Sequence, residues 1–134
     1  MDILLRLRHL EGTIPPLDAL QITPAQYAYI DKLRQVGPCS LQMLSQELEL
    51  TPPTVSVMIK ALERKGLVNR HRDNVDNRSF IFKLTRKGRN LYEQVDQFRK
   101  VRVANLLNRL EDQEQIQLLM LLDKATKKDQ ILER

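Results

Sequence analysis

The feature that most constrains the fold is a pair of helix patterns separated by only two residues. Ser40 can cap a first helix that runs over about residues 41–49. After a two-residue turn, the Thr51 hydroxyl can cap a second helix. Prolines 52 and 53 favour this helix start, because the first turn of a helix has no hydrogen bond for proline to lose. Gly66 ends that helix as a C′ glycine. Two helices joined by so short a turn predict a helix-turn-helix.

A β-hairpin is predicted directly after this unit. Two strand patterns, 67–72 and 79–84, flank a six-residue turn segment at 73–78 that is polar except for Val75, with Arg78 at the tip. A basic hairpin in this place predicts a winged helix. The start of the second helix can then enter a DNA major groove, where its backbone amides favour phosphate, and the hairpin can insert an arginine into the minor groove.

Further helix patterns flank the winged unit on both sides. Residues 1–12 predict a short helix, and Thr23-Pro24 with Gln26 predicts a capped helix up to Val36. Two more helices are expected over more than twenty residues from Thr85 and over about 112–128. The fold class is therefore mainly α (α+β). A single domain is expected, with residues 23–85 as the winged helix-turn-helix and residues 1–22 and 86–134 as dimerisation helices.

The flanking helices carry more apolar surface than the winged unit can cover. That unit has a core of its own, built from Leu33, Leu44, Leu48, Met58, Ile59 and Leu84. Because large apolar patches mark interfaces, we expect a homodimer. The residues expected at its interface are Ile3, Leu7, Leu10, Leu106, Leu110, Ile116, Leu119 and Leu122.

Composition excludes several protein classes. A chain of 134 residues with 42% hydrophobic and 29% charged residues is too apolar for a disordered protein. Its longest apolar run, Leu118–Leu122, is far short of a membrane span, and the first residues do not resemble a signal peptide. One cysteine allows no internal disulfide. We therefore expect a cytoplasmic protein with no membrane association.

The positive charge is concentrated in one stretch. Residues 60–89 hold ten basic and three acidic residues, a net charge of +7, whereas the rest of the chain carries −2. Such a field fits a polyanion, although many charge runs are only solvated faces.

No catalytic or metal-binding pattern is found. His9, His71 and Cys39 lack the spacing of metal ligands, and there is no nucleophile–base set and no glycine-rich phosphate loop. We expect no enzyme activity, no metal and no cofactor. Cys39 could be a redox sensor or a small buried hydrophobic residue, and we favour the second interpretation.

A family resemblance follows from four segments in order. Thr54-Val55-Ser56, the segment 62–70 (LERKGLVNR), Asp76-Asn77-Arg78 and the segment 83–88 (KLTRKG) resemble the signature of the MarR (multiple antibiotic resistance regulator) family. The likeness covers about residues 20–128. It implies a homodimeric bacterial transcription regulator on a pseudo-palindromic operator in double-stranded DNA. It also implies a repressor that is released by a small phenolic (aromatic) effector or by an oxidant, although no residues for such a ligand are identified.

The same resemblance implies roles at the DNA. Arg78 matches the arginine that enters the minor groove, and Asp76 the carboxylate that holds it. Val57 departs from the family, because many relatives carry arginine there; valine can only pack on a thymine methyl. The expected DNA-contacting residues are Pro53, Thr54, Ser56, Val57, Lys60, Arg64, Arg70, Arg72, Asp76, Arg78, Lys83 and Lys87.

One alternative from another class stays open. The chain could be a winged-helix interaction module whose basic face binds an acidic protein. Asp76 and Arg78 at the wing tip favour DNA, because a wing that binds protein needs no such arrangement.

Overall fold

The computed structural model describes residues 2–3, 5–6, 17 and 19–127. They belong to two compact units, Met1–Phe98 and Arg99–Arg134, which are described separately. The elements in chain order are α2 (Pro24–Val36), β1 (Cys39–Ser40), α3 (Leu41–Leu48), α4 (Pro52–Arg64), β2 (Val68–Arg72), β3 (Phe80–Leu84), α5 (Arg86–Leu107) and α6 (Asp112–Thr126). Residues 2–3 and 5–6 are helical, but most of the helix expected over 1–12 lies outside the described residues.

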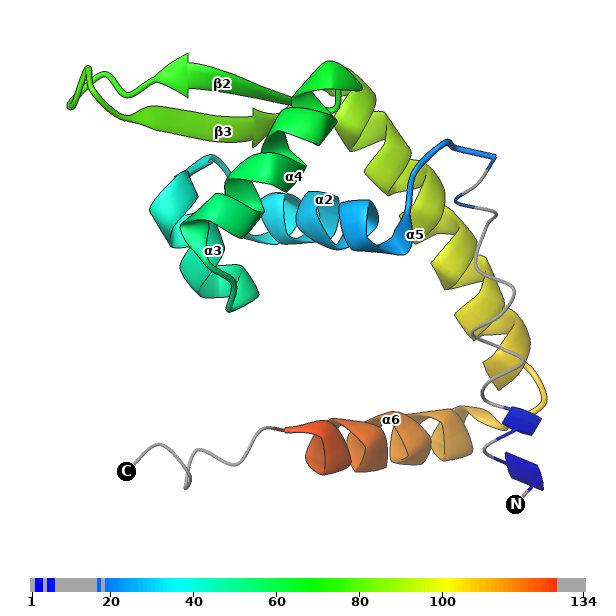
Figure 1. Cartoon of the computed structure of the whole chain (residues 1–134). Coiled ribbons are helices and arrows are strands. Elements are labelled where there is room, and N and C mark those ends of the chain that lie inside the picture. Colours follow the sequence, from blue (N-terminus) through cyan, green and yellow to red (C-terminus); the bar gives the residue numbers. More distant parts are fainter. Residues whose placement is uncertain (1, 4, 7–16, 18, 128–134) are drawn as a thin grey trace, which may run out of the picture. The chain divides into compact units, whose positions relative to one another are not determined.

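The first unit is a winged helix-turn-helix, as expected. Figure 1 shows α4 beside the β2–β3 hairpin, whose tip extends beyond the helices of this unit. The described helices of the second unit are the end of α5 and α6. Among the described residues, no helix combines the length and the apolar character that crossing a membrane requires.

The expected start and end of α2 are confirmed. The Thr23 hydroxyl accepts a hydrogen bond from the Gln26 backbone N–H at 3.0 Å. The Gln26 side-chain oxygen accepts the Thr23 backbone N–H at the same distance, which completes the capping box. Gly37 ends the helix with a positive φ of 81°, a conformation that glycine adopts without a steric penalty.

One of the two expected caps in the helix-turn-helix is wrong. The Ser40 hydroxyl accepts the Met43 backbone N–H at 3.1 Å and so caps α3 as expected. The Thr51 hydroxyl caps no backbone amide of α4, because it lies 2.8 Å from the Thr54 hydroxyl and is hydrogen bonded there instead. The expected end of α4 at Gly66 is confirmed, with φ 72°.

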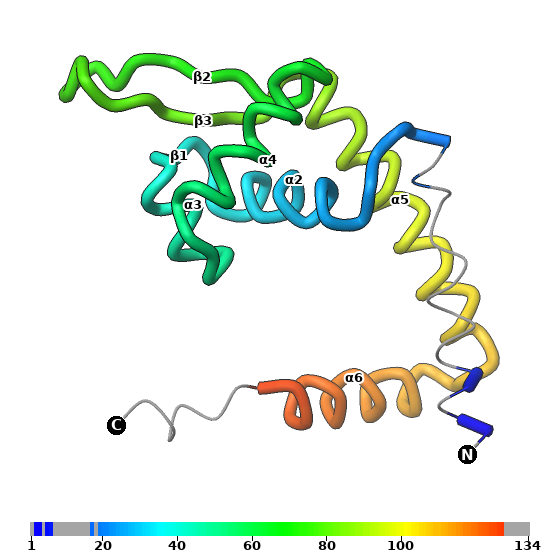
Figure 2. The backbone as a smooth tube through the Cα atoms, viewed as in Figure 1, coloured from blue at the N-terminus to red at the C-terminus, as the bar shows by residue number. Residues whose placement is uncertain are grey.

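The sheet has three antiparallel strands in the order β1-β3-β2. The hairpin is confirmed, with Val68 opposite Leu84 and Arg72 opposite Phe80. Strand β1 was not expected, because two residues carry no alternation and Ser40 also caps α3. Figure 2 traces its path beside the hairpin, where Cys39 pairs with Phe82.

The core of the first unit gathers side chains from every element of the winged domain and from the start of α5. Leu33, Leu44, Ile59 and Leu84 are buried in it as expected, whereas Leu48 and Met58 pack at its edge and are only partly buried. The start of α5 approaches closely at Gly88, where a Cβ atom would collide with the Leu67 backbone carbonyl. Glycine at this position therefore allows α5 to dock on the turn after α4.

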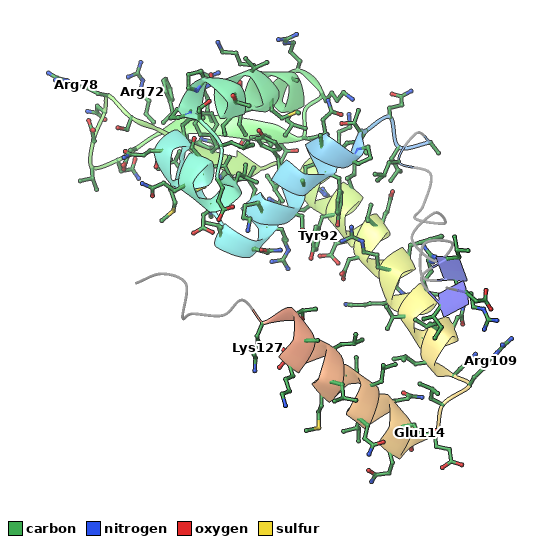
Figure 3. The ribbon with its side chains drawn as sticks, turned by 60° about the horizontal axis from the view of Figure 1, so that its bottom comes forward. Arg72, Arg78, Tyr92, Arg109, Glu114 and Lys127 are labelled. Carbon is green, nitrogen blue, oxygen red and sulfur yellow. The ribbon has the colours of Figure 1, made fainter. Side chains whose placement is uncertain are left out.

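The second unit exposes many of its apolar side chains. In α6, which begins with a capping box between Glu111 and Glu114, no residue is buried. Gln115 donates hydrogen bonds to the carbonyls of Leu107 (2.9 Å) and Leu110 (3.1 Å), which ties α6 to the end of α5. In Figure 3, Glu114 lies near the start of α6 and Lys127 at its end.

Candidate nucleic-acid interface

An exposed stripe runs along α4. Pro53, Val57, Lys60 and Arg64 are exposed and recur at the spacing of one helix face, with Thr54 exposed beside them. The Val57 side chain is 70% exposed on this face. The opposite face of α4 is buried through Val55, Ile59 and Leu62, and Ser56 lies half-buried at the border. The burial of one face therefore fixes which side chains the other face presents.

The start of α4 offers fewer backbone donors than expected. Pro52 and Pro53 occupy its first two positions and have no N–H group. Thr54 is thus the first residue of the helix with an amide hydrogen. Two of the first three backbone donors of α4 are therefore missing, which disfavours the expected phosphate binding by amides at this helix start.

The tip of the hairpin is ordered by its own side chains. Asp76 accepts hydrogen bonds from the Arg78 backbone N–H (3.0 Å) and from the Ser79 hydroxyl (2.9 Å). These two bonds, that from Arg78 first, hold the pKa of the Asp76 carboxyl below its usual value. Arg72 donates to the Asn77 carbonyl at 2.6 Å from the strand below. Figure 3 shows Arg78 at the outer end of the hairpin, pointing away from the helices of its unit.

Arg70 is engaged within the protein. Its Nε and Nη2 atoms donate to the two carboxylate oxygens of Glu63, each at 2.7 Å. The hydrogen bond from Arg70 lowers the pKa of Glu63, and the bond to Glu63 raises the pKa of Arg70. The guanidinium also lies over the rings of Phe80 (5.2 Å) and Phe82 (5.8 Å). The sequence placed Arg70 among the DNA contacts, and nothing in its spacing indicated these partners.

Lys87 also has a partner in the fold. Its ammonium group donates to the Lys65 carbonyl at 2.8 Å, and the Thr85 hydroxyl donates to the Gly66 carbonyl at 2.6 Å. Both bonds satisfy carbonyls at the C-terminal end of α4, which a cation also stabilises through the helix dipole. Lys65 in turn donates to Gln26 at 3.0 Å. Several basic residues near the hairpin thus help to hold α4 in place.

The remaining basic candidates are more open. Lys60, Arg64, Arg78 and Lys83 are exposed, and no carboxylate of the described residues lies within ion-pair distance of them. Lys83 alternates with the buried Phe82 and Leu84, so its side chain lies on the other face of the hairpin. The face that carries Phe80 and Phe82 is turned toward α4 and borders a groove of about 340 Å³. Ser56, Lys60, Arg70 and Phe80 line this groove in part. The structure therefore brings most of the candidates from α4 and the hairpin to one region and sets Lys83 apart from it.

Most of the described residues expected at a dimer interface are exposed. Leu7 and Leu10 lie outside the described residues, and Leu110 is half-buried. The other five are between 45% and 70% exposed: Ile3, Leu106, Ile116, Leu119 and Leu122. Four of these five lie in α5 and α6, and exposed apolar side chains on this scale are typical of an interface.

Redox and metal chemistry find no support in the described part of the chain. Cys39 is buried, and burial first, then the charge of Glu47, raises the pKa of its thiol, which disfavours the reactive thiolate. No group of three or more His, Cys, Asp or Glu side chains is placed to hold a metal ion among these residues.

Comparison with known proteins identifies the family. The family model described as "MarR family" matches residues 22–80. The chain is 34% identical over 102 residues to the HTH-type transcriptional regulator YkoM of Bacillus subtilis, covering 76% of this chain and 66% of that protein. It is 31% identical over 121 residues to the B. subtilis HTH-type transcriptional repressor MdtR, covering 87% and 78%. Among solved structures, an S. aureus MepR mutant bound to an oligodeoxyribonucleotide matches with a TM-score of 0.71 and 26% identity, over 92% of this chain and 94% of that one. The chain belongs to the MarR family of winged helix-turn-helix transcriptional regulators.

Proposed function

We propose that the chain is a homodimeric transcriptional repressor that binds a pseudo-palindromic operator in double-stranded DNA. The observation that carries this function is the exposed stripe of α4 beside a hairpin whose ordered tip presents Arg78. In a winged helix, a free helix face can enter the major groove while the hairpin follows the backbone into the minor groove. The oligonucleotide bound by the related MepR mutant supports DNA as the ligand, and the name of MdtR supports repression.

The side chains divide by the contact that each can make. Val57 and Lys60 lie along the centre of the α4 stripe and would face base edges, with Pro53, Thr54 and Ser56 near them at the start of the helix. Arg78 would enter the minor groove, with Asp76 and Arg72 ordering the turn behind it. Phosphate contacts would come from Arg64 and, outside the region that α4 shares with the hairpin, from Lys83 and Lys87.

The second unit would supply dimer contacts, together with residues 1–22 and 86–98 of the first unit. Exposed apolar residues lie on most faces of α6, and such a helix needs to be covered on more than one face. Residues 1–22 and 86–134 would pair the two protomers, so that each presents one α4 to one half-site. A small aromatic ligand or an oxidant would release the DNA, and the protein would work in the cytoplasm.

A salt titration tests DNA binding. Operator fragments are first selected from random duplexes, and affinity is then measured between 50 and 200 mM salt. If the dimer neutralises about 6–10 phosphates, affinity should fall roughly 10³–10⁵-fold over this range. No enriched palindromic sequence, or a flat salt response, contradicts the proposal and favours a protein partner.

A matched pair of variants locates the interface. Lys60→Ala with Arg64→Ala removes two cations from the α4 stripe, and Lys124→Ala with Lys127→Ala removes two at the C-terminal end of α6. Both pairs change net charge equally. Only the first pair should lower both the affinity and the salt slope strongly; equal losses would mean that total charge alone sets binding.

A further inference from the structure

We propose that Arg70 is a positioning residue: paired with Glu63, it fixes the hairpin at one angle to α4 and so sets where Arg78 reaches the DNA. The proposal rests on the proposed function and gives Arg70 a different role from the DNA contact that the sequence indicated. It concerns how the two DNA-contacting elements are held in register with each other.

The geometry of the pair is that of a two-point clamp. The Nε and Nη2 atoms of Arg70 meet the two oxygens of Glu63, each at 2.7 Å. Glu63 belongs to the last turn of α4 and Arg70 to β2. Two parallel, charge-assisted bonds fix orientation as well as distance, which a single contact cannot do. The clamp therefore joins the recognition helix to the wing at a defined angle.

The same guanidinium reaches the third element. Its carbon lies 5.2 Å from the centre of the Phe80 ring and 5.8 Å from that of Phe82, both on β3. Arg72 lies over the Phe80 ring as well, at 5.3 Å, and donates to the Asn77 carbonyl at the tip. A continuous series of contacts thus runs from Glu63 through two arginines and a phenylalanine ring to the turn that carries Arg78.

The pairing leaves little for DNA to gain from Arg70. The Nε and Nη2 edge of its guanidinium is occupied by Glu63, and the group lies over the two rings. A phosphate could therefore meet only the remaining Nη1 edge of this side chain, which is 41% exposed. The pair is also neutral as a whole, so it would release no counterions on binding. The Glu63 side chain is only 19% exposed, and without its partner a partly buried carboxylate would face the polyanion alone.

Glu63→Gln separates positioning from charge. Removing a negative charge beside the DNA should tighten binding if electrostatics alone matters. If the clamp sets the wing, Glu63→Gln should instead weaken operator binding by about tenfold, because a charge-assisted fork is lost. Glu47→Gln is the matched control, since Glu47 is exposed on α3 and the same charge is removed there. The control should bind as well as the wild type or slightly better.

Variants of Arg70 give the second measurement. A phosphate contact by Arg70 would be largely kept by Arg70→Lys, and Arg70→Met would lower the salt slope by about 1 per protomer. A positioning role predicts that Lys fails to rescue, because an ammonium cannot form the fork. It also predicts that Glu63→Gln with Arg70→Met binds no worse than either single variant, with the wild-type salt slope.

A third measurement excludes a merely structural role. The wild type should bind less well to operators that have G·C in place of A·T under the wing. Glu63→Gln should lose this preference for A·T under the wing but keep the wild-type preference for particular bases under α4. A folding defect would lower the fraction of active protein without changing either preference. Tightening by Glu63→Gln, rescue by Arg70→Lys or unchanged wing discrimination overturns the proposal. A wild-type protein that selects no DNA overturns the proposed function, and this inference falls with it.

Discussion

The carboxylate of Asp76 holds the backbone of Arg78 and not its side chain. One oxygen accepts the Arg78 backbone N–H at 3.0 Å and the other accepts the Ser79 hydroxyl at 2.9 Å. Among the described residues, no contact joins this carboxylate to the Arg78 guanidinium. The acid therefore shapes the turn from which the arginine extends, and the guanidinium stays exposed for a ligand.

Asp76→Ala should weaken operator binding, although it removes a negative charge from the DNA-facing tip. Without the two acceptor oxygens the turn is less ordered, so Arg78 loses more conformational entropy when it binds DNA. Asp76→Asn is the control, because an amide oxygen can still accept the Arg78 N–H without the charge. On one operator, the wild type and Asp76→Asn should both bind more tightly than Asp76→Ala. Equal tightening by both variants would mean that Asp76 acts only by repulsion.

Arg78→Ala should cost about 1–3 kcal/mol of binding free energy per half-site, and most on operators with A·T-rich flanks. Narrow minor grooves there concentrate negative potential around an inserted cation. Arg78→Lys should recover part of the loss. Lys87→Ala, by contrast, should weaken all sequences alike, because its ammonium lies at the α4 carbonyls and contacts no base. Competition titrations with A·T and G·C flanks measure the difference; equal losses for both flanks would contradict insertion.

Local signals in the sequence predicted most of the fold. The capping box of Thr23 and Gln26, the Ser40 cap and the Gly66 stop all depend on residues within a few positions of one another, and all are present. Strand β1 could not be predicted in this way, since its two residues become a strand only by pairing with Phe82 and Ile81, about forty positions away. Thr51 had two possible hydrogen-bond partners within a few residues, and its hydroxyl bonds the Thr54 hydroxyl instead of a backbone amide of the helix.

The candidate site was harder to predict than the fold. Exposure of Val57, Lys60 and Arg64 follows from helix periodicity, and the structure agrees with it. The partners of Arg70 and Lys87 do not follow from periodicity, because they depend on where β2 and α5 meet the end of α4. A concentration of positive charge indicates a polyanion partner but cannot separate cations that hold the fold from cations that face solvent.

The Glu63–Arg70 clamp should make stability depend on pH in a defined direction. Hydrogen bonding to Arg70 lowers the folded-state pKa of Glu63, so the stabilisation is complete above the unfolded pKa of about 4.3 and is lost as the pH falls through the lower folded value. Glu63→Gln should therefore cost roughly 0.5–1 kcal/mol of unfolding free energy between pH 5 and 7. The difference between wild type and variant should shrink below about pH 4. Denaturant titrations at several pH values measure it, and Asp76 contributes equally to both proteins. A difference that grows on acidification would contradict this sign.

Leu119→Glu should break the dimer. Leu119 is 52% exposed in α6, and a charge placed there would be buried against the partner in any interface that uses this helix. Sedimentation at micromolar concentration should show a dimer for the wild type and a monomer for the variant, with operator affinity falling in parallel. Gln117→Glu adds the same charge at a polar position of the same helix and is the control. A dimeric Leu119→Glu protein would place the interface elsewhere.

Val57 should contact a thymine methyl group in each half-site. Its side chain is 70% exposed at the centre of the α4 stripe and can form no hydrogen bond with a base, so an apolar contact is its only specific interaction. Replacing each operator thymine in turn by deoxyuridine removes one methyl group. At one position per half-site this should weaken wild-type binding by about fourfold, the equivalent of one buried methylene. Val57→Ala should bind more weakly and lose that sensitivity, whereas Val57→Thr, which keeps a methyl group, should retain part of it. If Val57→Ala responds to deoxyuridine as the wild type does, the methyl group is sensed by another residue. If no position responds, α4 recognises its operator through Thr54 and Lys60 without an apolar contact.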